Sequence, residues 1–276
     1  MDHLKKALDK ARKERPQPLS APAADRAVLG SGNGSGRVSP TYCRSRCLEL
    51  EPEKLAENRC VCLFADAPET ESFKVLSTRL LLSLRRNGCN TLMITSALPG
   101  EGKTLTAINL ALALAREVSQ TVLLVDCDLR QQKIHHYLGM QIDSGLGDYL
   151  LQERPLEELI VWPGVERFTF ISGGRTVQES AELIGSPRMK ALVAEMKSRY
   201  HDRYILFDVP PLLGSADALT FAPLVDAIIM LVEAEQTSIH TVLEAFELIP
   251  RDKFLGFVLN RYKAPLPGYG KEYGRR

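Results

Sequence analysis

A phosphate-binding loop is the clearest chemical feature of the sequence, at Ile94–Leu105, which reads ITSALPGEGKTL. The usual pattern is G-x-x-x-x-G-K-S/T, and its first glycine would fall where this chain has Ala97. In a loop that contains Gly100 and Gly102, backbone N–H groups can turn toward phosphate oxygens, and the following helix adds the positive end of its dipole. Pro99 can stiffen the loop where a flexible glycine is missing. We therefore expect this loop to hold a nucleotide phosphate despite the missing glycine.

Two side chains at the end of this loop would contact the nucleotide and its metal. Lys103 would reach the β- and γ-phosphates, and the hydroxyl of Thr104 would bind Mg²⁺. An apolar strand signal precedes the loop and a helical signal follows it, so a chance Gly-Lys-Thr turn is the weaker interpretation. The residues that we expect to bind the nucleotide are Pro99, Gly100, Glu101, Gly102, Lys103, Thr104 and Leu105.

Two carboxylates end the next apolar run, Val122–Gln131, which reads VLLVDCDLRQ. Strand alternation predicts that Asp126 and Asp128 project to the same side at the carboxyl end of the strand. Beside bound Mg–ATP, two such acids can hold the metal through water and accept a proton from an attacking hydroxyl. We expect Lys103, Asp126 and Asp128 to be catalytic. The alternative is that the two acids only form a turn or cap a helix.

A third motif, Tyr204–Leu219, reads YILFDVPPLLGSADAL and again ends an apolar run in an acid. Asp208 is placed as the Walker B aspartate is, where it helps to hold Mg²⁺. The Pro210-Pro211 pair ends the strand and fixes the loop beside the γ-phosphate. Three motifs in this order predict a Mg–ATP site in which Thr104, Asp126 and Asp208 hold the metal.

The elements that would position these motifs alternate between strand and helix signals from Asn90 onward. Apolar runs separated by helical segments predict a mostly parallel sheet covered by helices on both faces, an α/β fold. Ligands of such folds bind at the carboxyl ends of the strands, where the three motifs fall. The expected strands are Leu92–Thr95, Val122–Val125, Phe168–Ile171, Tyr204–Phe207, Ala227–Val232 and Leu255–Leu259. The expected helices are Glu51–Arg59, Glu69–Arg86, 104–118, 131–138, 186–200 and 237–249.

Composition divides the chain into four parts. Residues 1–15 carry a narrow apolar stripe at helical spacing among charges, which predicts a short helix that either docks on a partner or frays. Residues 16–40 are rich in Pro, Gly, Ser and Ala and predict a flexible linker. Residues 41–261 form the expected catalytic domain, and residues 262–276 form a disordered tail that carries tyrosines.

Charge and hydropathy limit the partners and the compartment. The formal net charge is +1, which gives no electrostatic reason to expect a nucleic-acid partner. No apolar run approaches the roughly 18–20 residues of a transmembrane helix, and the N-terminus lacks the apolar core of a signal peptide. We therefore expect a cytoplasmic protein with reduced cysteines, which a partner would have to bring to a membrane.

The three motifs together resemble those of the bacterial tyrosine kinases (BY-kinases) of exopolysaccharide synthesis, which have the P-loop NTPase fold. The resemblance rests on SALPGEGKT, on VLLVDCDLR as the second aspartate motif (Walker A′), and on FDVPP with DA downstream. The segments MDHLKKALDKARKER, GGRTVQESAELIGSPRM and GFVLNR are similar to the exosortase-associated branch. The similarity covers residues 41–262 together with the N-terminal helix.

The resemblance implies an ATP-dependent protein-tyrosine autokinase. Such a kinase phosphorylates tyrosines of its own tail in trans within a homo-oligomer, and a membrane protein of the chain-length-determinant type activates it and holds it at the inner face of the cell membrane. The resemblance also implies that Asn260 contacts the adenine. The candidate acceptors are Tyr269, Tyr273 and Tyr262, the last ranked lowest because it lies close to the final strand.

Three departures from the family pattern bear on assembly and control. The subunit-contact motif Glu-x-x-Arg-x-x-Arg is Glu71-x-x-Lys74-x-x-Ser77 here, which puts ring formation in doubt unless Arg79 or Arg85 serves instead. Gln132 stands where the Walker A′ motif usually has proline. The tail has fewer tyrosines than are common in the family. Phosphorylation would add about −1.5 to −2 charges to each, enough to reverse the tail's positive charge, whereas the alternative is an inert solubilising tail.

Other functions share this fold. A positioning ATPase of the partition type would carry a second lysine early in the loop, at the position of Leu98. An iron–sulfur carrier ATPase would need paired cysteines late in the chain, and no cysteine follows Cys127. A third alternative is a module that binds ATP without kinase activity, and the altered Glu71 motif is compatible with it.

The cysteines and histidines favour packing over metal binding. The four cysteines from Cys43 to Cys62 are spaced C-x3-C-x12-C-x-C, whereas zinc sites more often use C-x2–4-C pairs. Val61 and Leu63 predict a strand around the last two of these cysteines, in which the thiols pack as small apolar groups. Cys127 is expected to be buried, and His135-His136 to lie on a helix surface.

Overall fold

The computed structural model describes residues 46–48, 50–64, 67–116, 120–152, 154–199 and 203–263. The expected N-terminal helix, the linker, Cys43 and the tail tyrosines Tyr269 and Tyr273 lie outside these residues and stay predictions. Within the described part of the chain, no helix has the length and apolar character needed to cross a membrane.

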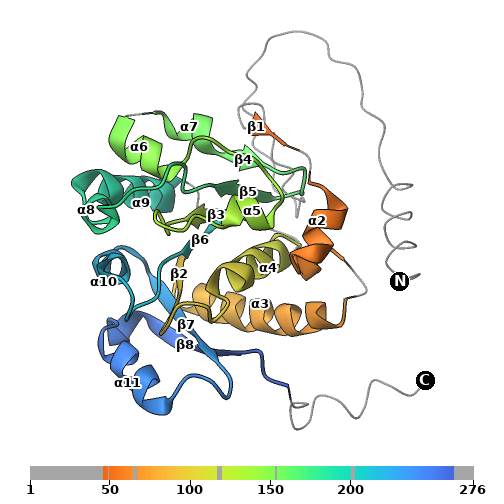
Figure 1. Ribbon diagram of the computed structural model, residues 1–276, viewed down its shortest axis with the longest axis vertical. Helices are drawn as coiled ribbons and strands as arrows, with labels where there is room; N and C mark the ends of the chain where they lie inside the picture. Colours follow the sequence, from red (N-terminus) through yellow and green to blue (C-terminus); the bar gives the residue numbers. More distant parts are fainter. Residues whose placement is uncertain are drawn as a thin grey trace.

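The centre of the fold is a single sheet, to which the described residues contribute eight strands in the order β1-β4-β5-β3-β6-β2-β7-β8 (Figure 1). Neighbouring strands are parallel, apart from the antiparallel pair of β4 and β5. β1 and β8 are therefore the opposite edges of this sheet. The strands are β1 (Arg46–Cys47), β2 (Thr91–Ser96), β3 (Thr121–Asp126), β4 (Val161–Trp162), β5 (Phe168–Ile171), β6 (Arg203–Asp208), β7 (Ala227–Glu233) and β8 (Phe254–Asn260).

Helices cover both faces of the sheet because its central strands are apolar on both sides (Figure 1). Every residue of β2 and of β3 is buried. One face packs against α2 (Pro52–Glu57), α3 (Pro68–Arg86), α4 (Lys103–Ala115) and α5 (Ile134–Tyr137). The other face packs against α6 (Leu146–Gln152), α7 (Leu156–Leu159), α8 (Ser180–Ile184), α9 (Pro187–Arg199), α10 (Ala216–Phe221) and α11 (Ile239–Glu247).

Helix α4 follows the phosphate loop and is buried along almost its whole length. Its sequence, KTLTAINLALALA, is apolar on nearly all sides because the helix lies between the sheet and α3. Among its buried polar residues, Asn109 uses both ends of its amide: Oδ1 accepts from Cys62 N (3.0 Å) and Nδ2 donates to Arg59 O (3.0 Å). The segment before α3 is thereby tied to the helix that carries the catalytic loop.

All six expected strands are present, and each extends at most one residue beyond the expected bounds. The helix expected over 131–138 is only the short α5. The two-residue strands β1 and β4 and the short helices α6, α7, α8 and α10 are not predicted by the sequence. Segments of two to seven residues contain too few turns or alternations to show a periodic pattern.

The expected strand around Cys60 and Cys62 is wrong. These residues lie at a 3-10 turn, η1 (Val61–Leu63), which closes when Phe64 N donates to Val61 O (2.9 Å). Both thiols are nevertheless buried as expected, and burial raises the pKa of each to about 12. Both therefore pack as small neutral groups.

The expected surface position of the histidine pair is wrong for His135. Helix α5 is too short to present a clean outer face, and it turns this ring toward the loop after β5. The Nδ1 atom of His135 lies 3.1 Å from Ser172 Oγ, and burial together with His136 lowers the pKa of His135. His136 is exposed as expected.

Candidate nucleotide site

The phosphate loop connects β2 to α4 and uses its two glycines for backbone shape. Gly100 and Gly102 have φ values of +90° and +89°, in the left-handed region that favours glycine. Ala97, at the position of the missing glycine, has a negative φ and is fully buried. The alanine therefore causes no backbone strain, and the altered motif is compatible with an intact loop.

The backbone of this loop forms an open cradle for an anion. Within the described residues, no N–H group from Gly100 to Thr104 donates to a protein acceptor. A Cβ on Gly102 would lie 2.3 Å from Asn260 Nδ2, so this position has no space for a side chain. Unpaired amides at a helix N-terminus are the arrangement that binds phosphate.

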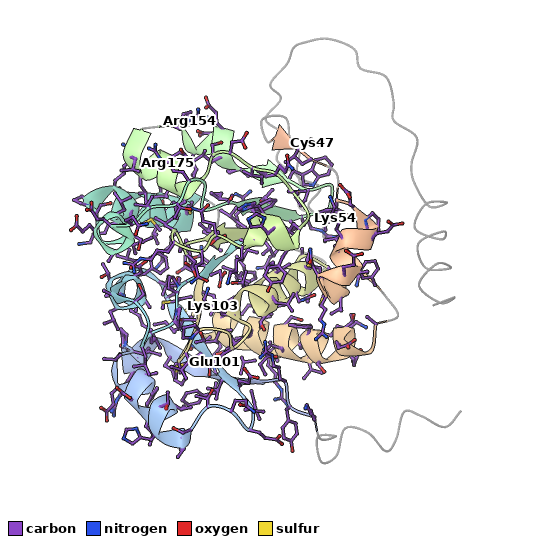
Figure 2. The ribbon with its side chains drawn as sticks, in the orientation of Figure 1. Cys47, Lys54, Glu101, Lys103, Arg154 and Arg175 are labelled. Atoms are coloured by element: carbon purple, nitrogen blue, oxygen red, sulfur yellow. The ribbon has the colours of Figure 1, made fainter. Side chains whose placement is uncertain are left out.

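Lys103 is the first residue of α4, directly after the two glycines of the loop (Figure 2). Its Nζ is 3.0 Å from Asp128 Oδ2, 3.5 Å from Asp208 Oδ1 and 3.4 Å from Thr104 Oγ1. Burial disfavours the ammonium, but the two carboxylates outweigh burial and raise the pKa of Lys103. The structure thus brings together four of the predicted site residues, which come from three different motifs.

Asp126 has a role that strand alternation did not predict. β3 ends at Asp126, so Asp128 lies in the turn beyond the strand and the alternation argument does not apply to it. Asp126 Oδ2 accepts from Lys133 N (3.1 Å) and Ile134 N (3.2 Å), and Oδ1 accepts from Asp128 N (3.1 Å). Asp126 thus holds the first backbone amides of α5 and also fixes the turn that presents Asp128.

The pairing of β3 with β6 brings Asp126 and Asp208 together, since these residues are register partners. Both are fully buried. Burial and the charge of Asp208 raise the pKa of Asp126 to about 8. Burial also raises the pKa of Asp208, and Lys103 and Thr104 act in the opposite direction.

The carboxylate of Asp208 fits a divalent cation. Within the described residues, neither of its oxygens accepts a hydrogen bond of ordinary geometry. Lys103, at 3.5 Å, compensates part of the charge of this buried carboxylate, and a bound divalent cation would compensate the remainder. The adjacent Thr104 hydroxyl adds the oxygen ligand that Mg²⁺ prefers.

Replacing Asp208 with asparagine should stabilise the nucleotide-free protein while removing its response to Mg–ADP. The pKa of Asp208 is higher in the folded protein than in the unfolded chain, so ionisation of this carboxyl lowers the stability of the fold. This loss of stability is absent at pH values below the unfolded pKa and is complete at pH values above the folded pKa. The gain in melting temperature should therefore be larger at pH 8 than at pH 5. Wild-type protein should gain about 2.7 kcal/mol at about 100 times its Kd for Mg–ADP, a gain that the variant loses.

The matched control for this prediction is Asp252→Asn, because Asp252 is an exposed carboxylate away from the site. It should change neither the melting temperature nor the response to Mg–ADP. A lower melting temperature for nucleotide-free Asp208→Asn at pH 8 would show that Asp208 is satisfied without a cation.

The loop after β6 packs directly against the phosphate loop. Leu212 N donates to Ser96 O (2.9 Å) and Leu213 N to Ala97 O (3.2 Å). Thr95 Oγ1 donates to Pro210 O (2.7 Å). The two prolines therefore lie in the loop beside the phosphate site, as the sequence predicts.

Glu101 and Asn260 meet at the base of the loop. Asn260 Nδ2 donates to Glu101 O (2.8 Å), and Asn260 Oδ1 accepts from Arg261 N (2.9 Å). The carboxylate of Glu101 is buried and bonds inside the protein, so only its backbone faces the cradle. The sequence pattern did not predict these internal contacts, nor the contribution of Glu233 and Thr237 to them.

The three departures from the family pattern also have structural descriptions. On α3, Lys74 pairs with Glu71 (3.2 Å) at the surface, whereas Ser77 is buried and donates to Lys74 O (2.9 Å). Arg85 donates to Gln120 Oε1 (3.3 Å). Gln132 packs so closely on Gly173 that a Cβ there would lie 2.5 Å from it. Tyr262, the acceptor candidate within the described residues, is partly exposed.

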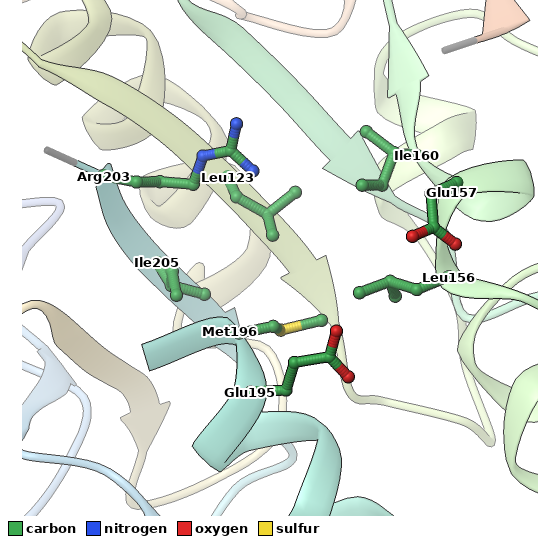
Figure 3. A pocket seen from close by; sticks show the side chains of 8 residues that line it. All are labelled: Leu123, Leu156, Glu157, Ile160, Glu195, Met196, Arg203 and Ile205. Atoms are coloured by element: carbon green, nitrogen blue, oxygen red, sulfur yellow. The ribbon is translucent and has the colours of Figure 1, made fainter. Parts of the chain in front are cut away.

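A separate small cavity lies between β3, β6 and helices α7 and α9 (Figure 3). Its volume is about 20 Å³, enough for about one water molecule. It is remote from the phosphate loop and contains none of the predicted site residues. Its lining residues are Leu123, Leu156, Glu157, Ile160, Glu195, Met196, Arg203 and Ile205.

Comparisons with known proteins find similarity to bacterial tyrosine kinases. The family model described as an AAA domain matches residues 90–252. The chain is similar to tyrosine-protein kinase YwqD of Bacillus subtilis strain 168, with 30% identity over 196 residues covering 70% of this chain and 81% of YwqD. It is also 30% identical over 219 residues to the putative tyrosine-protein kinase EpsB of Ralstonia nicotianae. That match covers 76% of this chain, but the chain spans only 28% of EpsB.

The fold is likewise similar to a solved structure. The crystal structure of the VpsO kinase domain matches with a TM-score of 0.61 and 28% sequence identity. The match covers 76% of this chain and 97% of that domain.

Proposed function

The chain belongs to the family of bacterial tyrosine kinases, the BY-kinases, and we propose that it is an ATP-dependent protein-tyrosine autokinase that regulates exopolysaccharide synthesis and export. The observation that carries this proposal is the position of Lys103 between Asp128 and Asp208, beside an open cradle of backbone amides. A site of this kind supports phosphoryl transfer by positioning and charge stabilisation.

Each part of the proposed mechanism is assigned to a group of the site. The backbone amides from Gly100 to Thr104 would bind the β- and γ-phosphates. Leu105, the next residue along α4, would complete the nucleotide-binding segment. Thr104, Asp208 and the neighbouring Asp126 would hold Mg²⁺. The metal would neutralise negative charge on the phosphates. Lys103 would compensate the negative charge that develops during transfer.

The acceptor would be the phenol of a tail tyrosine from a second subunit, Tyr269 or Tyr273 ahead of Tyr262. Its oxygen would bond to the γ-phosphorus as the bond to the bridging oxygen of ADP breaks. We assign the phenol proton to Asp128, because Asp128 is 8% exposed whereas Asp126 is fully buried. Asn260 would contact the adenine with the part of its amide that its loop contacts leave accessible.

A membrane protein of the chain-length-determinant type is the proposed activator, and it would hold this kinase at the inner face of the cell membrane. The exosortase-associated branch is the proposed subfamily, on the segments quoted above. Ring assembly through α3 would need residues other than Ser77, which is buried. Leu98, at the position of the second lysine, disfavours the alternative of a partition-type ATPase switch.

The test is phosphotyrosine detection after incubation of the purified protein with Mg–ATP. The protein should be assayed alone and fused to the cytoplasmic segment of its membrane partner, and the fusion should give the stronger signal. ATP hydrolysis without phosphotyrosine in either form would contradict the kinase and favour an ATPase switch.

A further inference from the structure

Glu101 is an unusual residue for a loop that binds phosphate, because it places a carboxylate within a site for polyanions. Its side chain is 2% exposed, so its charge must be balanced inside the protein. Figure 2 labels it beside Lys103, on the same loop. Its environment therefore decides whether it helps or hinders nucleotide binding.

Three protein donors satisfy this carboxylate. Oε2 accepts from Leu98 N at 2.8 Å, within the phosphate loop itself. Oε1 accepts from the backbone N of Glu233, the last residue of β7, at 3.3 Å, and from the hydroxyl of Thr237 in the connection between β7 and α11. The carboxylate thus bridges the first half of the loop to the end of β7 and to the connection that follows it.

The backbone of Glu101 is held as well. Its carbonyl oxygen accepts from Asn260 Nδ2 at 2.8 Å, at the end of β8. An ion pair of Arg261 Nη1 with Glu233 Oε2, at 2.7 Å, joins the ends of β8 and β7 next to this contact. Glu101 is therefore fixed from two strand ends, β7 and β8, that lie far along the chain from the loop.

We propose that Glu101 is a positioning residue of the nucleotide site, which sets the shape of the phosphate loop through its side chain without touching the nucleotide. Leu98 N is held by the carboxylate, and the amides from Gly100 to Thr104 are thereby left unpaired for phosphate. This loop lacks the usual first glycine and begins Ala97-Leu98-Pro99. The contacts of the Glu101 carboxylate with Leu98, Glu233 and Thr237 hold its conformation. The inference rests on the proposed nucleotide site.

The first experiment measures the Kd for Mg–ADP of the full-length protein and its variants. Glu101→Ala removes all three side-chain contacts and should weaken binding by about tenfold or more, as loss of hydrogen bonds to a charged group does. Glu101→Gln keeps an oxygen for Leu98 N but places an amide against Glu233 N–H, so it should restore part of the affinity. Glu244→Gln, an exposed substitution on α11, is the matched control and should bind as wild type does.

A double-mutant cycle with Thr237→Val separates positioning from direct contact. Thr237→Val alone should weaken binding by a smaller factor, because it removes one donor to Oε1. In the Glu101→Ala background it should have no further effect, since the bridge is already absent. If Glu101→Ala does not fold, the cycle is run with Glu101→Gln, where the effect of Thr237→Val should shrink.

Melting temperatures of the nucleotide-free variants are measured alongside, so that general destabilisation is recognised. Wild-type affinity in both Glu101 variants overturns the inference, as does a cycle in which the two substitutions are additive. Failure of the wild-type protein to bind Mg–ADP overturns the proposed function instead.

Discussion

Replacing Lys103 with methionine should reduce ATP-dependent phosphotyrosine by at least about a hundredfold, the cost of removing one preorganised charge from a transfer site. Lys103 is the cation that contacts both Asp128 and Asp208, and it projects from the first turn of α4 beside the open amides. Methionine matches its length without its charge. The γ-phosphate would then face two carboxylates with no ammonium between them.

The expected defect is electrostatic, so it should appear in Mg–ATP binding and in transfer, whereas the fold itself should be retained. Circular dichroism should show an unchanged secondary structure, although nucleotide-free stability should fall at pH 8 because two buried carboxylates lose their partner. Lys190→Met, an exposed change on α9, is the control. Retention of more than a tenth of the wild-type signal in Lys103→Met would remove Lys103 from the mechanism.

Loss of the tail should abolish phosphotyrosine while leaving ATP binding intact. A protein lacking residues 262–276 keeps all of the described nucleotide site, which ends at Asn260 and Arg261. The measurement is a phosphotyrosine blot together with the Kd for Mg–ADP. Tyr269→Phe with Tyr273→Phe should reproduce most of the loss, whereas Tyr262→Phe alone should have little effect.

Mixing two inactive proteins tests whether transfer occurs between subunits. Lys103→Met keeps the tail and lacks a working site, and the truncated protein keeps the site and lacks the tail. Their mixture should regain phosphotyrosine on the full-length chain, in a concentration-dependent manner. A signal from the truncated protein alone would place the acceptor outside residues 262–276, and no signal from the mixture would contradict transfer in trans.

Much of this site follows from local sequence because its key groups lie at the carboxyl ends of strands or shortly after them. The proximity of Lys103, Asp128 and Asp208 could be predicted, because the carboxyl ends of parallel strands lie at the same edge of a sheet. The six strands were predictable because each is an apolar run, and all of them except the edge strand β8 are buried on both faces.

The contacts that escaped prediction depend on tertiary neighbours. The bond from Asn260 to Glu101 joins positions 159 residues apart, and no local pattern marks it. Asp126 was assigned to metal and catalysis by its place on a strand, but the donors that occupy it come from the start of α5. His135 lies on a helix of four residues, which is too short for periodicity to show which side is buried.

The order of the strands places the two ends of the described chain at opposite edges of the sheet. The described chain enters at β1, on one edge of the sheet, and leaves after β8, on the opposite edge. Seven strand spacings separate the two edges, a distance of about 33 Å. A contact made at the β1 edge would therefore lie on the opposite side of the sheet from the point where the described chain leaves it.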